Sequence, residues 1–323
     1  MIKALFSTRN KKRLVFLILT TVSCFLYKNI SKPLSHDSIN LIFSPKTSSY
    51  DIAEELAKNN VIKSSWEFLI RHWLTFPKKT LIAGEYLFNT HSSCQQILHQ
   101  IQSGKVVIRK ITIPEGWTVS QVIDLLTENE FLQGEIINFP KEGSVLPETY
   151  LFTRGENRQV VLNRMCKAMT DFVQKLWKDF KNHPCFIKTP EMLLILASII
   201  EKETGIKSER PRIAAVFLNR LKLKMPLQSD PTVIYGLTLG KKILNRSLSR
   251  NDLASLSIYN TYKIMGLPPQ PIACPGKESL KSVLYPLITK ELYFVANGEG
   301  GHNFSETLEQ HNRHVAQWRK INR

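Results

Sequence analysis

The chain has 323 residues, 43% of them hydrophobic, and a formal net charge of +17, so it has room for about two domains and can bury a core. A basic surface can bind nucleic acid, anionic lipid or an anionic wall polymer. The sequence contains no RNA- or DNA-binding motif, and its aromatic residues do not interleave with a basic stripe, so nucleic acid is not expected as a partner. The five cysteines are irregularly spaced without a CxxC pair, which argues against zinc ribbons and thioredoxin-like chemistry and favours small buried side chains.

The N-terminus is basic and then apolar. Residues 1–13 hold five Lys or Arg and no acid, and Leu14–Tyr27 carries no charge. We predict that residues 1–13 stay in the cytoplasm and that residues 14–28 form a single-pass anchor in the inner (cytoplasmic) membrane, with everything after it on the periplasmic or outer side. An apolar run of this length is short for a span, which usually needs ~20 residues. A cleaved signal, or a lipoprotein processed at Cys24, is therefore the alternative.

A weak internal repeat follows the polar linker at residues 29–38. Its units start at INLIF, GEYLF and VIRKIT, and each combines a β-like run, a polar turn, a Ser or Thr cap and an amphipathic helix. Capping-box spacing, in which side chains satisfy the free amides of the first turn, occurs or nearly occurs at Ser48-x-x-Asp51, Ser92-x-x-Gln95 and Thr118-x-x-Gln121. The pattern predicts a small α/β subdomain over residues 38–110.

Small strand–helix–helix–strand modules of this kind resemble LysM-like domains, which bind glycan. A packing subdomain without a ligand is the alternative. Residues 38–110 contain no acid at the end of an apolar stripe in a loop-rich setting, so we expect this subdomain to position a glycan and to carry no chemistry.

Residues 111–323 are predicted to form a mixed α+β domain, which makes the chain α+β overall. Apolar residues near 3.6 spacing predict a helix over residues 157–180. Thr189-Pro190 is typical of a helix start, and the helix is predicted to end with Glu203, where Gly205 stops it. Ser208 is expected to cap the next helix, which should run to Lys224.

The last part of the chain is expected to be loop-rich. In chain order we predict loops up to Pro275, a helix near Ser279–Leu287, a strand at Leu292–Ala296 and a terminal helix after Ser305. The loop GEGGH lacks a following Lys-Ser/Thr, so it is not a phosphate-binding loop. His302 and the pair His311 and His314 have no third ligand nearby, so neither a metal site nor a cofactor is expected.

Glu203 is the candidate catalytic residue. On a helical wheel at ~100° per residue it lies at the polar end of an apolar stripe, whereas Glu201 lies about 160° away. This stripe consists of Leu193, Leu196, Ile199 and Ile200. Desolvation at such a position raises the pKa of a carboxyl group, as a proton donor near neutral pH requires. The alternative is an acid that only pairs with Lys202, Lys207 or Arg210.

Hydrogen-bonding and aromatic side chains in two later segments are candidate sugar contacts. LQSDPTVIYG offers Gln228, Ser229, Asp230, Thr232 and Tyr235, and YNTY offers Tyr259, Asn260 and Tyr262. Sugars need polar partners together with flat apolar faces, and the Asn260 amide suits an acetamido group. A turn or a core contact is the alternative for each, since Ser-Asp-Pro is also a common turn former.

Several long motifs together resemble one known family. The segment TPEMLLILASIIEKETGIKSERPRIAAVFLNRLKLKMPLQSDPTVIYGL (residues 189–237) is similar to the endolytic murein transglycosylases, the YceG-like lytic transglycosylases. The resemblance extends through YNTYKIMGLPPQPIACPG and LYFVANGEGGHNF, and back to IPEGWT and LPETYLF. It covers most of residues 40–318. LPETYLF departs from the aromatic-rich, Asp-bearing version that is usual at that point.

The resemblance implies an enzyme that cuts the MurNAc–GlcNAc bond within nascent peptidoglycan strands, leaves 1,6-anhydroMurNAc ends and so terminates strand elongation. It implies that Glu203 is the single general acid and base, that the two polar segments line the groove, and that peptidoglycan synthases are possible partners. Two other hypotheses stay open. One is a non-catalytic peptidoglycan-binding scaffold, and the other is a basic membrane-associated binder of nucleic acid.

Overall fold

The structure, a computed structural model, describes residues 38–76, 78–89 and 92–321. The predicted cytoplasmic segment 1–13 and the predicted anchor 14–28 lie outside these residues. The internal contacts divide the chain into two compact units. The first contains the described residues up to Arg109 together with Thr153–Gly155, and the second contains Lys110–Phe152 and everything from Glu156 onward.

The first unit has the element order strand–helix–helix–strand–helix. In chain order these elements are β1 (Ile39–Phe43), α2 (Ser49–Lys58), α3 (Ser65–Thr75), β2 (Gly84–Phe88) and α4 (Cys94–Gln102). Strands β1 and β2 pair in antiparallel fashion, with Leu41 opposite Tyr86. The helices contribute Leu56, Phe68 and Ile101, all without exposed surface, to the core beneath this pair.

The helix caps agree with the sequence prediction at two of three positions. The Ser48 side chain accepts a hydrogen bond from the Asp51 amide, and Thr118 forms a full capping box with Gln121 at the start of α5 (Val119–Glu128). The third prediction is wrong by one residue, because Ser93 with Gln96, and not Ser92 with Gln95, makes the capping box of α4. Both serines precede the same amphipathic run, so spacing alone did not separate them.

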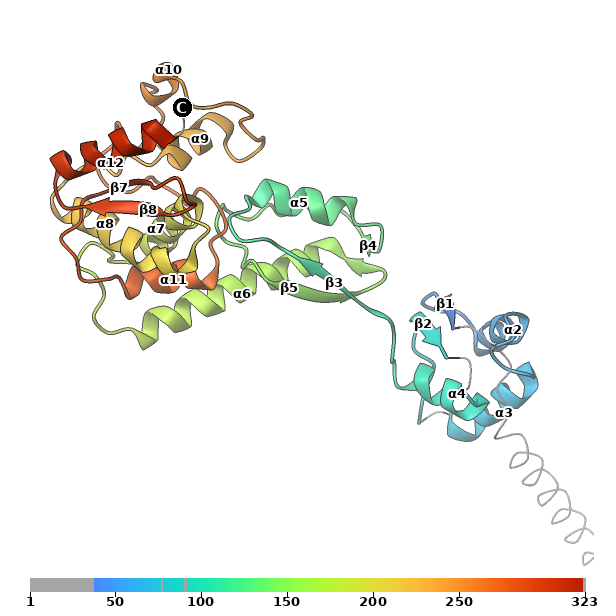
Figure 1. The fold of residues 1–323 in the computed structure, drawn as a ribbon. Helices are drawn as coiled ribbons and strands as arrows, with labels where there is room; N and C mark the ends of the chain where they lie inside the picture. The colour runs from blue at the N-terminus through green and yellow to red at the C-terminus, as the bar shows by residue number, and fades with distance from the viewer. Residues whose placement is uncertain (1–37, 77, 90–91, 322–323) are drawn as a thin grey trace, which may run out of the picture. The chain divides into compact units, whose positions relative to one another are not determined.

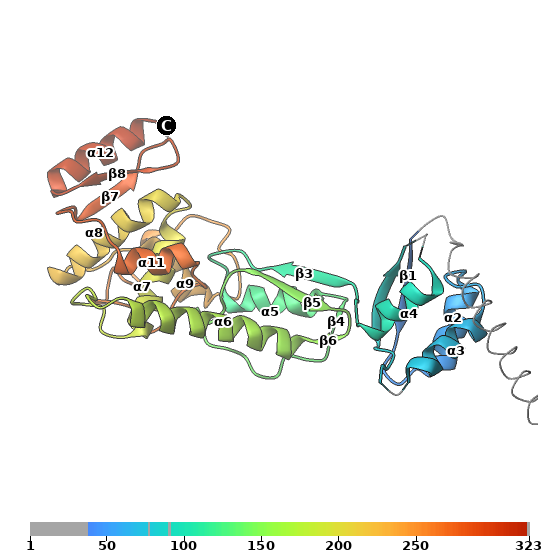
Figure 2. The ribbon, with the colours of Figure 1, turned by 90° about the horizontal axis from the view of Figure 1, so that it is seen from below.

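The first half of the second unit is a small α/β layer. Strand β3 (Ile108–Thr112) pairs with β5 (Thr149–Thr153), and the short strands β4 (Leu132–Gln133) and β6 (Glu156–Asn157) pair in parallel. Figure 2 shows α5 beside the long helix α6 (Arg158–Asp179), with β3 and β5 next to them. Asn157 caps α6 through its side chain, which agrees with the predicted helix over residues 157–180.

A helical layer forms the second core of this unit. It contains α7 (Pro190–Glu203), α8 (Arg210–Lys222) and α11 (Lys277–Leu284), which lie together in Figure 1. The apolar stripe that the sequence analysis identified on α7 is fully buried, with no exposed surface on Leu193, Leu196, Ile199 or Ile200. Burial of such a stripe against other helices is the main source of helix stability in proteins.

Helix α7 begins and ends where predicted, but the way it ends differs from the prediction. Thr189 caps it and Pro190 is its first residue. Its C-cap is Thr204, in an extended conformation, and Gly205 does not adopt a positive φ, so the helix ends without the predicted left-handed glycine cap. The predicted cap at Ser208 is also wrong, because a 3-10 turn, η2 (Lys207–Glu209), leads into α8 without a side-chain cap.

The segment expected to be loop up to Pro275 contains two further helices. These are α9 (Asp230–Thr238) and α10 (Arg250–Leu253). The Ser-Asp-Pro sequence that suggested a turn is the start of α9, with Ser229 at the N-cap and Pro231 in the first turn. Proline has no amide hydrogen to leave unsatisfied there, so the same residues that form turns also begin helices.

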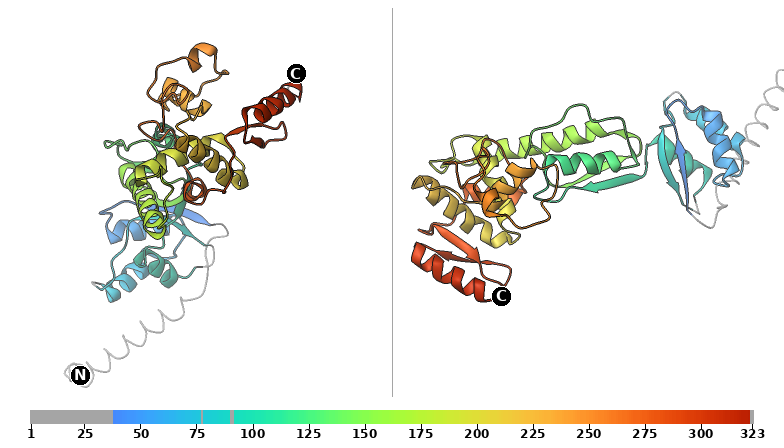
Figure 3. Two further views of the ribbon diagram at one scale, coloured as in Figure 1. Left: turned by 90° about the vertical axis from the view of Figure 1, so that its left-hand side faces the viewer. Right: turned by 90° about the horizontal axis from the view of Figure 1, so that it is seen from above.

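The C-terminus forms a hairpin covered by a helix. Strands β7 (Tyr293–Ala296) and β8 (His302–Ser305) pair in antiparallel fashion, and α12 (Leu308–Ile321) packs on both. Figure 3 shows α12, in red, beside the hairpin. The predicted strand and terminal helix are confirmed, while the helix predicted near Ser279–Leu287 starts and ends earlier, as α11 does.

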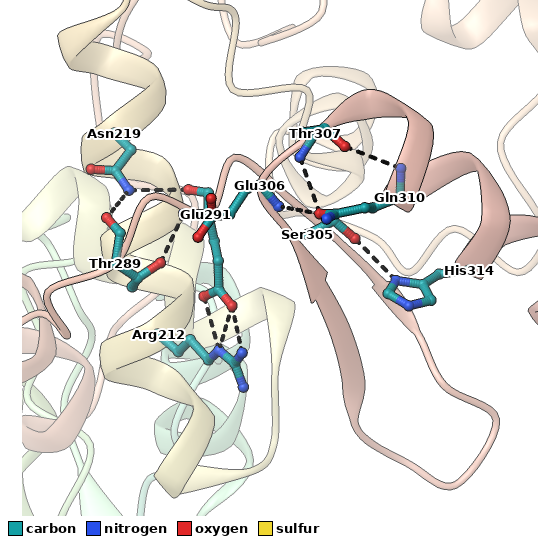
Figure 4. Close-up of polar contacts among 9 residues, drawn as sticks. All are labelled: Arg212, Asn219, Thr289, Glu291, Ser305, Glu306, Thr307, Gln310 and His314. Atoms are coloured by element: carbon teal, nitrogen blue, oxygen red, sulfur yellow. Dashed lines mark hydrogen bonds and ion pairs between the residues drawn. The ribbon is translucent and has the colours of Figure 1, made fainter.

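Polar contacts hold this hairpin to α8 (Figure 4). The Arg212 guanidinium binds the Glu291 carboxylate, and the Asn219 amide donates to the backbone carbonyls of Thr289 and Glu291 at 2.8 and 3.0 Å. On the other side of the hairpin, Ser305 Oγ lies 3.0 Å from His314 Nδ1. Together these contacts fix β7, β8 and α12 as one wall beside the helical core.

Among the described residues, no helix combines the length and apolar composition that crossing a membrane requires. The four described cysteines form no disulfide bonds. Cys274 is buried and Cys94 and Cys166 are partly buried, as expected for small core residues, but Cys185 is exposed.

Candidate active site

Glu203 is the last residue of α7 and lines a surface cleft of about 380 Å³. It extends the buried stripe of α7 by one turn, to the point where the helix emerges at the cleft. Glu201 points elsewhere, as its place on the helical wheel predicts. Its carboxylate accepts hydrogen bonds from the Arg210 guanidinium at 2.8 Å and from Ser279 Oγ at 2.7 Å. The two acids of the Glu-Lys-Glu sequence therefore have different environments.

The Glu203 carboxyl has a pKa raised to about 7. Desolvation by burial is the main cause, and the negative charge of Asp230 raises the pKa further. A hydrogen bond from Ser229 Oγ to Glu203 Oε1 and the positive charge of Arg220 act in the opposite direction. A pKa near neutrality allows both the protonated and the ionised carboxyl near neutral pH, so the group can both give and take a proton.

The Ser229 side chain reaches Glu203 because hydrogen bonds to Thr232 and Thr261 hold its loop in place. Ser229 is the N-cap residue of α9, yet its side chain makes no cap hydrogen bond and is directed to Glu203 instead. Its amide donates to Thr261 Oγ1 at 2.9 Å. Thr232 Oγ1 donates to the Ser229 carbonyl at 2.6 Å and lies 2.8 Å from Thr261 Oγ1. Two buried threonines thus set the position of the serine that contacts Glu203.

The cleft is lined by two groups of residues from distant parts of the chain. One group comes from the end of α7, from α8 and from the segments around α9 and Tyr262, and the other comes from the hairpin and α12. The first group is Glu203, Arg220, Leu227, Gln228, Asp230 and Tyr262. The second is Phe294, Val295, Ala296, His302, His311 and Val315.

Three of the predicted sugar contacts, Gln228, Asp230 and Tyr262, line this cleft. Tyr262 OH donates to Asp230 Oδ1 at 2.6 Å, and burial together with this bond raises the pKa of Tyr262. Gln228 is exposed and has a positive φ of 52°, a backbone conformation that non-glycine residues adopt at a cost of about 1–3 kcal/mol and that clusters at functional sites.

The other predicted contacts lie outside the cleft. Thr232 and Asn260 have no exposed surface. The Asn260 amide is engaged with the Leu253 and Ser255 carbonyls, so it braces the loop and does not face solvent. Tyr235 packs against Tyr259, with ring centroids 4.9 Å apart, and lines a second cavity of about 570 Å³, to which α5, α9 and the segment after α9 contribute.

Arg220 also lines the cleft, although the sequence did not single it out. It is 7% exposed, and its guanidinium donates to the Leu292 carbonyl at 2.6 Å and the Leu227 carbonyl at 2.9 Å. Burial lowers its pKa. The available signal was a charged residue on the apolar face of α8, at helical spacing from Ile213 and Phe217.

His302 is a second residue of the cleft that the sequence analysis considered only as a metal ligand. Its Nδ1 lies 2.8 Å from Glu209 Oε2, and its backbone amide donates to Glu209 Oε1 at 2.9 Å. Burial acts to raise the pKa of Glu209, but the bonds from His302 outweigh it and the pKa lies below its usual value. Thr204 Oγ1 also donates to Glu209, which links the end of α7 to the hairpin.

Comparisons with known proteins agree on one family. The model of the YceG-like family matches residues 42–317. The chain is 32% identical to an endolytic murein transglycosylase of Bacillus subtilis (strain 168), with 90% of this chain and 88% of the relative covered. It is 27% identical to an endolytic murein transglycosylase of Streptococcus pneumoniae serotype 2 (strain D39 / NCTC 7466), with 77% of this chain and 54% of the relative covered.

A solved structure supports the same assignment. The crystal structure of a yceG-like protein from Listeria monocytogenes matches with a TM-score of 0.51 and 31% sequence identity, and the match covers 86% of this chain and 99% of that chain. Since the family model also spans most of the chain, this protein belongs to the YceG-like family.

Proposed function

We propose that the protein is a peptidoglycan lytic transglycosylase, a lyase that cuts MurNAc–GlcNAc bonds within nascent glycan strands and so terminates their elongation. The observation that carries the proposal is Glu203, a carboxyl with a pKa of about 7 at a surface cleft. Its support is membership of a family in which two relatives are named endolytic murein transglycosylase.

In the proposed reaction Glu203 serves twice. Its protonated carboxyl gives a proton to the departing glycosidic oxygen, and the resulting carboxylate then takes the proton of the C6 hydroxyl of the muramyl sugar. That oxygen attacks the anomeric carbon and closes a 1,6-anhydro ring, so the proton returns to Glu203 and no water is consumed. A pKa near neutrality suits a group that must act as acid and base in one turnover.

The substrate contacts are part of the same proposal. Gln228, Asp230 and Tyr262 line the cleft beside Glu203, and we assign them direct contacts with the sugars. The Ser229 hydroxyl orients the Glu203 carboxyl. Thr232, Asn260, Tyr235 and Tyr259 support the loops around the cleft.

The product distinguishes this reaction from hydrolysis. Digestion of murein by the wild-type protein should yield 1,6-anhydromuramyl ends, one water lighter than the reducing ends that a hydrolase leaves, and the cuts should fall inside strands. Mass analysis of the digest tests the proposal directly. Reducing muramyl ends would identify a hydrolase, and an undigested strand would leave the non-catalytic scaffold as the better hypothesis.

We assign the first unit a LysM-like role in glycan binding. Support comes from its strand–helix–helix–strand core, in which β1 and β2 pair around α2 and α3. On this assignment residues 38–110 hold the strand while residues 111–323 cut it. Peptidoglycan synthases, which make the substrate, are the corresponding protein partners.

The proposed site of action is the outer side of the inner membrane, where nascent strands are made. Basic residues before Leu14 and the uncharged run to Tyr27 favour an N-terminus that stays inside. A reporter that is active only outside the cytoplasm, fused after Arg323, should therefore be active. Activity of a fused reporter that works only in the cytoplasm would contradict this topology.

The raised pKa of Glu203 predicts how activity depends on pH. Glu203 must be protonated to start the reaction, and its protonated fraction falls as the pH rises above about 7. The value of kcat/KM, which reports the free enzyme, should therefore decline about tenfold per pH unit on the alkaline side. A pH–rate profile on murein measures this decline.

Two neighbouring substitutions should shift this decline in opposite directions. Ser229→Ala removes a hydrogen bond that lowers the pKa of Glu203, so its decline should begin at a higher pH. Asp230→Asn removes a negative charge that raises the pKa, so its decline should begin at a lower pH. Shifts in the same direction would show that another group controls the profile.

A further inference from the structure

Helix α3 of the first unit carries an exposed apolar stripe. The large side chains of Trp66, Ile70, Trp73 and Leu74 are 68%, 45%, 73% and 62% exposed. At ~100° per residue these four positions fall within an arc of about 100° on one side of the helix. Scattered exposed apolar residues are ordinary, but a continuous patch of this kind marks an interaction surface.

On α3 a charged pair lies on the inner side and large apolar side chains face solvent, which is the reverse of an ordinary surface helix. Phe68 has no exposed surface and anchors the inner side in the core. Glu67, 9% exposed, also lies on the inner side and forms an ion pair with Arg71 at 2.9 Å, whose side chain is 11% exposed. The helix therefore places a charged pair on its inner side and leaves two tryptophans in water, an arrangement that a partner on the outer side would stabilise.

The surroundings of the stripe indicate which partner this is. Lys63 precedes the helix and Lys78 and Lys79 follow it, all exposed. Tryptophans next to basic residues are typical of helices that lie at a membrane interface, where the indole sits at headgroup level and Lys binds anionic lipid. The uncharged run Leu14–Tyr27 ends fewer than 40 residues before α3, so the stripe is close in sequence to the predicted anchor.

We propose that the outer face of α3, defined by Trp66, Ile70, Trp73 and Leu74, docks into the headgroup region of an anionic lipid bilayer. The inference goes beyond the proposed reaction and stands or fails separately from it. A glycan platform fits less well. Sugar sites combine aromatic faces with hydrogen-bonding side chains, whereas here the tryptophans share their side of the helix with the aliphatic Ile70 and Leu74.

Docking of this face would place the first unit against the bilayer. The same unit is proposed to bind glycan, so its remaining surface would meet strands close to the membrane where they are made. This face therefore supplies a second membrane attachment besides residues 14–28, with an affinity that scales with the apolar area it buries.

Tryptophan quenching by brominated lipid tests the proposal on the full chain. The protein is mixed with vesicles of phosphatidylcholine and phosphatidylglycerol whose acyl chains are plain or brominated, because bromine quenches only indoles that reach the bilayer. Of the five tryptophans of the chain, Trp66 and Trp73 should be quenched. The Trp66→Phe/Trp73→Phe variant should lose this quenching, while Trp177→Phe, which alters a tryptophan stacked on His183, should keep it.

A second variant keeps both reporters and removes the apolar contact. Ile70→Ser/Leu74→Ser retains Trp66 and Trp73, and it should lose roughly half or more of the quenching, because membrane affinity scales with the buried apolar area. Both positions are exposed, so the fold should survive, and far-UV circular dichroism checks this.

Three results would overturn the proposal. Brominated and plain vesicles giving equal emission would show that the tryptophans do not reach the bilayer. Emission that responds to soluble murein fragments and not to vesicles would identify a glycan platform. Emission that changes only with protein concentration would identify a second copy of the chain as the occupant.

Discussion

Glu203→Gln is expected to reduce murein cleavage to near the background rate while leaving the fold intact. Loss of general acid catalysis costs roughly 10²–10⁴-fold, and in the proposed reaction both proton transfers use this one carboxyl. Glutamine keeps the shape and can still bond to Ser229 Oγ, but it cannot release a proton. Release of anhydromuramyl fragments from purified sacculi, followed by mass analysis, measures the loss.

The same helix offers a matched control. Glu191 lies in the first turn of α7 and is exposed, so Glu191→Gln makes the same chemical change on the same helix without touching the cleft. Its activity should equal that of the wild type. If Glu203→Gln retained activity within about tenfold of the wild type, a loss smaller than general acid catalysis provides, the single-acid mechanism would be wrong. Asp230 would then be the next carboxyl to test.

The position of Glu203 was predictable because it depends on local order. A 3.6-residue period and a Thr-Pro start fix which side of α7 is buried, and Glu203 follows on that side whatever the rest of the chain does. The same helical wheel predicted that Glu201 and Glu203 lie on different sides of α7, and the contacts of Glu201 with Arg210 and Ser279 confirm this. The end of α7 at Glu203 was predicted as well, but its cap was not, because Thr204 in an extended conformation ends the helix without a left-handed glycine.

The remainder of the cleft depends on contacts between distant segments. Arg220 meets the Leu292 carbonyl more than 70 residues away, and His302 meets Glu209 more than 90 residues away. Polarity marked Thr232 and Asn260 as sugar contacts, but polarity does not reveal burial. Both are fully buried and satisfied by loop hydrogen bonds, an outcome that only the packed structure decides.

The second prediction with a large expected effect concerns the buried ion pair between Arg210 and Glu201, which lies near Glu203. Arg210 is 3% exposed, and its guanidinium binds Glu201 at 2.8 Å and Glu115 at 3.0 Å. The other oxygen of Glu201 accepts from the Gly276 amide and Ser279 Oγ at the start of α11. One carboxylate thus ties α7 to α8 and α11, two residues before the candidate catalytic acid.

Arg210→Met should lower the free energy of unfolding by about 3–5 kcal/mol, because it leaves the Glu201 carboxylate buried without its positive partner. Urea denaturation followed by circular dichroism measures the change. An exposed pair provides the control. Arg313 and Glu309 on α12 have side chains 67% and 82% exposed, so Arg313→Met should cost less than about 0.5 kcal/mol.

A double-mutant cycle separates the loss of the pair from the loss of packing. Glu201→Gln removes the same charge interaction from the other side, so Glu201→Gln/Arg210→Met should lose less stability than the sum of the two single variants, by up to about 3 kcal/mol. Strict additivity would mean that the pair contributes only through independent packing. Because Glu201 ties the last turn of α7 to α8 and to the start of α11, the single variants should also lower kcat on murein in the fraction that remains folded. Unchanged kcat in that fraction would show that the stripe of Leu196 and Ile200 alone holds Glu203 in place.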